Sequence, residues 1–203
     1  MLVDKIVPTY ENAFKFAAST QIDMEASYER VREQGTTFTD AEQEVIDEAI
    51  AAVTPERVLQ NLREKEGEYF YARHFGKAAA YLHLGKWSLG DRIAYEPSPQ
   101  RQKVYGAFRR IAIVNTFRAP MGIFSLVGAE GAHEMVQQTG MNELVQLAVE
   151  KAGNRDIYIG ASVGDPAIGV LEDNIFHKTD FTAREMQNVP ALQQTLYIRE
   201  SNP

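Results

Sequence analysis

The spacing of apolar residues changes at Gly67, and this change limits the folds open to the chain. Before it, apolar residues recur at helical spacing within residues 13–35, 39–53 and 54–67. After it, aromatic and apolar residues alternate with the period of two that strands require. The chain therefore predicts a helical N-terminal segment, residues 1–53, and a core of strands and helices in residues 54–203.

Helix-capping signals support the helical part. Thr39 and Glu42 have the spacing of a capping box, and Thr54 precedes Pro55 as a cap before a first-turn proline. Gly35 and Gly67 follow the ends of two of these segments, where glycine commonly stops a helix.

The strand part begins with a hairpin. Residues 68–75 and 78–87 predict two strands around a tight turn at Gly76-Lys77. Further strand candidates are residues 109–117, 122–131, 155–164, 176–186 and 192–201. Asp165 and Pro166 open a short helix before the last pair. Strands interrupted by helices in this order predict an α/β protein of the α+β type, with a mixed, mostly antiparallel sheet.

One further helix follows the stretch "QQTGMN", residues 137–142. Leu144, Leu147 and Ala148 share one face of it, so it can pack on a sheet. Two interpretations of its start remain open. Thr139 is an ordinary N-cap, or the glycine lets free backbone N–H groups at a helix N-terminus hold a phosphate.

Composition bounds the partners. The formal net charge is −7, which weighs against duplex nucleic acid, although residues 101–110 form a local basic run. The chain has no cysteine, no apolar run long enough for a bilayer and no signal-peptide pattern at its start. We therefore expect a cytoplasmic protein with no membrane partner. No His or carboxylate spacing predicts a metal site.

Three stretches, in this order, resemble motifs of the GNAT superfamily of acyl-CoA-dependent N-acetyltransferases. Residues 54–85 are similar to the family's second helix and first hairpin. Residues 137–142 fall where the family has its pyrophosphate loop, Gln/Arg-x-x-Gly-x-Gly/Ala. Residues 165–181 are similar to its Asn-x-x-Ala-x-x-Leu-Tyr-x-x-x-Gly-Phe segment. The resemblance implies a single GNAT-like domain with an insertion near residues 88–110.

The resemblance also implies a cofactor site for acetyl-CoA as cosubstrate. It implies that the strands at residues 123–130 and 156–163 splay apart, and that a bulge exposes a backbone N–H that polarises the thioester carbonyl. The implied cofactor-binding residues are Leu126, Val127, Gly128, Gln137, Gln138, Thr139, Gly140, Met141 and Asn142. An alternative placement of the loop uses Arg118 and Gly122, and would make residues 123–136 helical.

The chain departs from the family pattern at three positions. Asn142 stands where the loop normally has a second small residue, and Ile175 replaces a glycine. Leu171 aligns with the tyrosine that protonates the departing CoA thiolate in many members, and leucine has no proton to give. Catalytic candidates for accepting the proton of the amine are Glu130, His133 and Glu134, at the end of the strand before the loop.

The resemblance implies an N-acetyltransferase in which an amine of the acceptor attacks the thioester directly. The acceptor is a small molecule or a protein amine, and the N-terminal segment offers an acceptor lid or a homodimer contact. A catalytically inactive GNAT-like binding or structural module is the alternative, motivated by Asn142 and Leu171. A third interpretation is an unrelated α+β protein that lacks the splayed strands.

Overall fold

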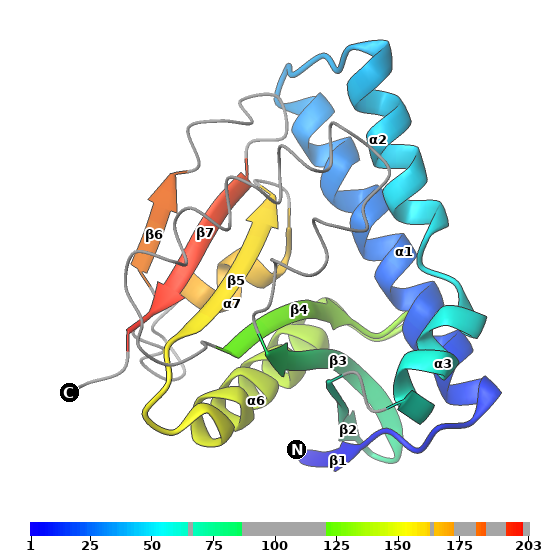
Figure 1. Ribbon diagram of the computed structural model, residues 1–203, viewed down its shortest axis with the longest axis vertical. Coiled ribbons are helices and arrows are strands. Elements are labelled where there is room, and N and C mark those ends of the chain that lie inside the picture. Colours follow the sequence, from blue (N-terminus) through cyan, green and yellow to red (C-terminus); the bar gives the residue numbers. More distant parts are fainter. Residues whose placement is uncertain (65–66, 87–120, 163–164, 173–181, 186–193, 201–203) are drawn as a thin grey trace.

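A computed structural model of the chain describes residues 1–64, 67–86, 121–162, 165–172, 182–185 and 194–200. They form a mixed seven-stranded sheet of order β1-β2-β3-β4-β5-β7-β6, with helices on both faces (Figure 1). Only β4 and β5 run parallel among the described strands, and every other neighbouring pair is antiparallel. The predicted mixed, mostly antiparallel sheet is confirmed.

The elements have the following bounds. The helices are α1 (Tyr10–Glu33), α2 (Asp40–Ala51), α3 (Pro55–Glu64), α6 (Glu134–Ala152) and α7 (Ala167–Glu172). The strands are β1 (Leu2–Lys5), β2 (Glu68–His74), β3 (Lys77–Lys86), β4 (Met121–Gly128), β5 (Ile157–Ser162), β6 (Thr182–Glu185) and β7 (Gln194–Arg199). The predicted strand at residues 109–117, the insertion at 88–110 and the basic run at 101–110 lie outside the described residues.

The N-terminal segment is helical except at its start. The capping box of Thr39 and Glu42 is present, and the Thr54 hydroxyl accepts from the Arg57 N–H at 3.2 Å. Residues Leu2–Lys5, however, form β1, which pairs antiparallel with β2. The expectation of a wholly helical segment is therefore wrong there, because four residues are too few to display an alternating pattern.

The first hairpin turns one residue earlier than expected. Phe75 and Gly76, rather than Gly76 and Lys77, occupy the turn with φ of 48° and 78°. Positive φ at both central residues is the geometry of the type I′ turn, whose twist matches that of the flanking strands.

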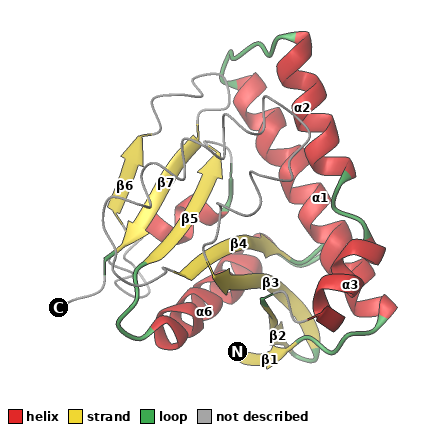
Figure 2. Cartoon of the chain, in the orientation of Figure 1, coloured by secondary structure: helices red, strands yellow, loops and turns green. Residues whose placement is uncertain are grey.

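The sheet separates two apolar cores. Alternate residues of β2 and β3 face opposite sides, with Phe70 and Leu82 on one face and Tyr69 and Tyr81 on the other. The first face packs against α6 and α7 and the second against α1 and α3 (Figure 2). No helix in the described part of the chain is long and apolar enough to span a bilayer.

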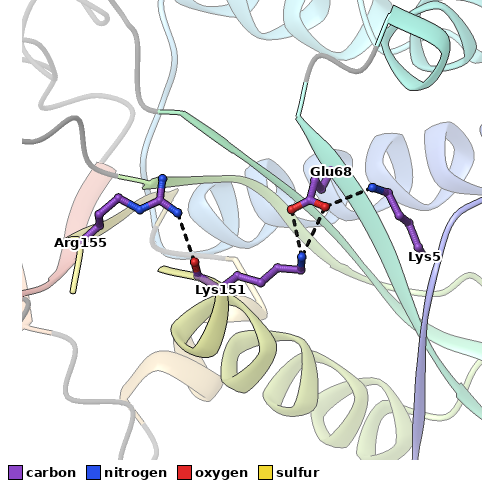
Figure 3. Close-up of polar contacts among 4 residues, drawn as sticks. All are labelled: Lys5, Glu68, Lys151 and Arg155. Atoms are coloured by element: carbon purple, nitrogen blue, oxygen red, sulfur yellow. Dashed lines mark hydrogen bonds and ion pairs between the residues drawn. The ribbon is translucent and has the colours of Figure 1, made fainter. Parts of the chain in front are cut away.

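Glu68, the first residue of β2, connects β2 to β1 and α6. Its carboxylate lies 3.1 Å from the Lys5 ammonium of β1 and 3.1 Å from the Lys151 ammonium of α6 (Figure 3). Lys151 also lies over the Phe70 ring, at 4.9 Å from the centroid. Partial burial raises the pKa of Glu68, but Lys151 and then Lys5 outweigh it and hold this pKa below its ordinary value.

We expect Glu68→Gln to destabilise the protein by about 1 kcal/mol at pH 7, since half-exposed ion pairs contribute little each. The lowered pKa means that this stabilisation is present at neutral pH and disappears as the pH falls through the acid range. Urea unfolding at pH 7 and pH 3 measures it. Glu150→Gln, next to Lys151 but exposed, is the matched control. An equal loss in both variants would contradict the network.

Candidate functional site

The parallel strands β4 and β5 separate after a short paired stretch. Met121–Ile123 pair with Ile157–Ile159, and there the β4–β5 ladder ends. Beyond it β4 continues beside β3 to Gly128, whereas β5 continues beside β7 to Ser162. The splay that the resemblance implied between these strands is confirmed. It contradicts the third interpretation, which was an unrelated α+β protein without splayed strands.

A β-bulge in β4 lies where the splay begins. His83 pairs with Ser125 and Leu84 with Ile123, which leaves Phe124 as the extra residue. Ile123 and Leu126 both contribute to the core beneath α6. Residues three apart on a regular strand face opposite sides, so their shared face also indicates an extra residue between them. A bulge of this kind redirects the backbone groups that follow it.

The bulge decides which β4 amides face the diverging strand. The Ala129 N–H donates to the Ala79 carbonyl of β3 at 2.9 Å, so by alternation the Val127 N–H also points to β3. The N–H groups of Leu126 and Gly128 therefore point toward the side from which β5 has separated. Of the three residues expected to polarise a carbonyl, Leu126 and Gly128 have the required direction and Val127 does not.

The helix after β4 starts earlier than the sequence suggested. α6 begins at Glu134 with His133 as its N-cap, and residues 137–142 lie inside it. The expectation of a loop or helix start at Gln137, Gln138, Thr139, Gly140, Met141 and Asn142 is therefore wrong. The amide groups at the helix start belong to residues 133–136 instead. The alternative with a helix over residues 123–136 is also wrong, because β4 extends to Gly128.

Gly140 has a packing role in this helix. A Cβ atom there would lie 3.0 Å from the Ala79 Cβ and 3.1 Å from the Ala80 Cβ, so α6 approaches β3 closely at this point. Thr139, expected as a cap, donates its hydroxyl to the Met135 carbonyl at 2.7 Å within the helix. Met141 and Asn142 are both buried. Thr139 and Gly140 have the sequence pattern of a helix start, but they lie inside α6, where Gly140 allows close contact with β3.

Gln137 connects the helix to the end of β4. Its side-chain amide donates to the Ala129 carbonyl at 2.8 Å and covers Gly128, where a Cβ would meet it at 2.6 Å. Gln138 instead donates to the exposed Glu134 carboxylate at 3.3 Å. Gln137 therefore fixes the position of the loop between β4 and α6.

The three catalytic candidates lie in that loop and the first turn of α6. The His133 Nδ1 accepts from the Met135 N–H at 3.3 Å, and the Glu130 N–H donates to the Ser19 hydroxyl of α1 at 3.1 Å. All three candidate side chains, including Glu134, are exposed. Glu130 also adds, after burial and Tyr71, to the causes that raise the pKa of Tyr81 to about 12.

Leu171 is a core residue of α7, with 2% of its surface exposed. Its side chain packs among the apolar residues beneath α6 and carries no proton to donate. The tyrosine beside α7 is Tyr197 of β7, whose hydroxyl donates to Glu172 at 2.6 Å. Burial and this hydrogen bond raise the pKa of Tyr197, which keeps the phenol protonated.

From Ser19 onward, α1 has a buried polar stripe that no sequence motif marked. Its first buried residues, Ala13, Phe16 and Ala17, are apolar and pack against the sheet. Ser19, Thr20 and Ser27 follow as buried polar residues, and the Thr20 hydroxyl lies 3.5 Å from the Ser125 hydroxyl of β4. Asp23 occupies the same stripe. The repeated polar residues at helical spacing are the signal by which the sequence displays it.

Asp23 interacts with Asp165, the N-cap carboxylate of α7. Burial first, and then the charge of Asp165, raise the pKa of Asp23 to about 7, against the lowering effect of Arg30. Burial raises the pKa of Asp165 to about 6, although the Ala167 N–H, at 2.8 Å from its Oδ1, and Arg30 act to lower it. The two carboxylates are therefore titratable groups near neutral pH between α1 and α7.

A sheet whose central parallel pair splays beside a bulge and a helix N-terminus defines a class of fold. The chain is similar to solved structures of acetyltransferases of this class. An aminoglycoside 6′-acetyltransferase type Ii matches with a TM-score of 0.54, 9% identity and coverage of 100% of this chain and 99% of that one. A GNAT-family acetyltransferase from Streptococcus agalactiae matches with a TM-score of 0.54, 10% identity and coverage of 100% of this chain and 96% of that one.

A third structure is the PaiA N-acetyltransferase from Thermoplasma acidophilum in complex with coenzyme A, with a TM-score of 0.53, 10% identity and coverage of 98% and 99%. No family model matches the chain, and no curated protein sequence matches it. The chain thus has the GNAT fold.

Proposed function

We propose that the protein is an acyl-CoA-dependent N-acetyltransferase that transfers an acetyl group to an amine. The observation that carries the proposal is the separation of β4 from β5 beside the start of α6. Because β5 pairs with β4 only as far as Ile123, the Leu126 and Gly128 N–H groups point to the side of β4 where no strand pairs with them. An extended ligand with amide groups can use such donors as an added strand would.

The start of α6 supplies the second element of the proposed site. A helix N-terminus carries about half a positive charge, which suits a pyrophosphate. At the start of α6 the Met135 and Val136 N–H groups already donate to His133, so a pyrophosphate would rely mainly on the helix dipole and on the N–H groups before them. The loop of residues 129–133, with Gly131 at φ 73°, brings the chain into this helix. We therefore place the pyrophosphate at residues 131–136 rather than at 137–142. Gln137 contributes by holding the loop against β4.

In the proposed reaction the amine nitrogen attacks the thioester carbonyl carbon, the C–S bond breaks and the amine loses a proton. The Leu126 or Gly128 N–H stabilises the oxygen as negative charge develops on it. Glu130, His133 and Glu134, near the same end of β4, remain the candidates for accepting the proton. No acid is assigned to the CoA thiolate, since Leu171 cannot serve.

A second candidate function is a binding module without catalysis. Two observations favour it: Leu171 lies in the core, and the carboxylates of Glu130 and Glu134 flank the helix start where a pyrophosphate would lie. Release of free thiol from acetyl-CoA with a panel of amines separates the two functions. Binding of acetyl-CoA without thiol release for any amine would favour the module.

Acetyl-CoA should stabilise the protein by about 2.7 kcal/mol at a hundredfold excess over its dissociation constant. That corresponds to roughly 5–10 °C in melting temperature for a chain of this size. We expect Glu134→Gln to tighten binding several-fold, because it removes a negative charge from the first turn of α6. Glu150→Gln, at the other end of the same helix, is the control.

Thermal melts with and without acetyl-CoA, followed by calorimetric titration, measure both effects. A melting temperature that does not move at millimolar acetyl-CoA would exclude the proposed cosubstrate. Equal affinities of the wild type, Glu134→Gln and Glu150→Gln would place the phosphates away from the start of α6.

A further inference from the structure

The buried polar stripe of α1 leads toward Asp165. Asp23, Ser27 and Arg30 recur at spacings of four and three residues, so their side chains leave the helix in similar directions. Asp23 and Arg30 both interact electrostatically with Asp165. Ser27 lies between them on the helix and must therefore face the same space.

Ser27 indicates, independently of the two carboxylates, that a ligand binds here. Only 5% of its surface is exposed, and its buried hydroxyl has no hydrogen-bond partner among the described residues. A buried hydroxyl without a partner is costly to the folded state, so such groups normally bind something. A ligand that bonds to Ser27 would lie beside both carboxylates.

The charges of this stripe are unbalanced. Two carboxylates, Asp23 and Asp165, share one described cation, Arg30, and the groups facing them from β7 and α7 are Tyr197 and Glu172. The Tyr197 hydroxyl donates to Glu172, so neither of these adds a positive charge. A cationic ligand would restore the balance.

We propose that Asp23 and Asp165, with the Ser27 hydroxyl, bind the protonated amino group of the acceptor. The assignment of this ligand as the acceptor rests on the proposed acetyltransferase function. A primary ammonium has three N–H donors, which matches two carboxylates and one hydroxyl.

The site is formed by parts of the chain that are far apart in sequence. Asp23 and Ser27 lie on α1, which also meets the end of β4 through the Ser19–Glu130 and Thr20–Ser125 contacts. Asp165 follows β5, the strand that separates from β4. An amine held between α1 and the segment after β5 would thus lie on the side of the sheet where the two strands diverge.

Calorimetric titration of the full-length protein with 1,4-diaminobutane at pH 8 tests the proposal, with 1,4-butanediol as the neutral analogue. We expect the diamine to bind and the diol not to bind. Asp23→Asn and Asp165→Asn should each weaken diamine binding about 10- to 100-fold, the range for a lost hydrogen bond to a charged group. The amide oxygen introduced by Asp165→Asn can still accept the cap bond from the Ala167 N–H. Glu25→Gln removes one charge from the opposite face of α1 and should change the affinity by less than about twofold.

Titration of the same proteins with acetyl-CoA separates the two proposals. Equal acetyl-CoA affinity in all variants, with weakened diamine binding in the two Asp variants only, supports the amine site. Diamine affinities unchanged in Asp23→Asn, or no preference of the wild type for the diamine over the diol, would overturn it while acetyl-CoA binding leaves the proposed function standing. Absence of acetyl-CoA binding would overturn the proposed function. If Asp165→Asn does not fold, Asp23→Asn decides.

Discussion

Gly140→Leu should destabilise the protein by about 3 kcal/mol or more, without a matching loss of acetyl-CoA affinity in the protein that remains folded. A Cβ at this position already lies 3.0 Å from the Ala79 Cβ and 3.3 Å from the Ala80 amide nitrogen. A larger side chain must push α6 away from β3, and overpacking of this kind typically costs about 1–3 kcal/mol or more. Urea unfolding at a fixed pH measures the loss.

Gly169→Ala is the matched control for this prediction. Gly169 also lies in a helix, but a Cβ there meets nothing within 4 Å. Alanine should therefore stabilise α7 by roughly 0.5–1 kcal/mol through helix propensity alone. Were Gly140 instead part of a phosphate loop, Gly140→Leu would abolish acetyl-CoA binding while leaving the unfolding curve close to that of the wild type.

The contrast between Gly140 and Gly131 shows why the fold was predictable from the sequence and the position of the loop was not. Both glycines precede apolar helical residues, and Gly140 follows a threonine that looks like a cap. Only the packing of α6 on β3 shows that the helix continues back to Glu134 and that Thr139 bonds within it. Tertiary contact, which a single sequence does not display, decided between the two.

The elements themselves were predictable where local chemistry is strong. The capping box of Thr39, the Thr54 cap and the Asp165 cap are all present, because each depends on residues within one helical turn. β1 was missed since its partner β2 lies more than sixty residues away. The splay of β4 and β5 was expected from resemblance, not from the periodicity of either strand.

The Asp23–Asp165 pair was not predicted because nothing local marks it. Asp23 lies in the middle of a charged helix, and Asp165 is explained as an N-cap. Their electrostatic interaction appears only in the folded chain, where residues distant in sequence come close. The only signal in the sequence was the set of polar residues at helical spacing on α1. That signal can be recognised only when it is known which face of the helix is buried.

Asp23→Asn should stabilise the protein at pH 8 by about 2 kcal/mol, and the gain should disappear near pH 4. The pKa of Asp23 is raised by burial and by Asp165 from its ordinary value of 3.8 to about 7. A carboxyl whose pKa is raised by folding favours the folded state fully below pH 3.8, and this contribution is lost as the pH rises through 7. At pH 8 the wild type carries the charge in its folded state, whereas asparagine does not.

The size of the effect follows from the same values. A pKa difference of one unit between the folded and unfolded chains corresponds to about 1.4 kcal/mol, so the full difference sets an upper bound of about 4 kcal/mol. Partial exposure and relaxation reduce it to about 2 kcal/mol, or roughly 4–8 °C in melting temperature. Thermal melts of the wild type, Asp23→Asn and the Glu25→Gln control between pH 4 and pH 8 measure it.

A stability gain at pH 8 combined with loss of diamine binding would show that Asp23 is kept charged at the expense of folding. Residues retained for function commonly destabilise the folded state, and their replacement stabilises it. A structural Asp23 gives the opposite result, since breaking a favourable ion pair with Arg30 would lower the melting temperature at pH 8 and leave diamine affinity unchanged. The melting-temperature difference at pH 8 and the diamine affinity, measured on the same variant, therefore together separate a binding carboxylate from a structural one.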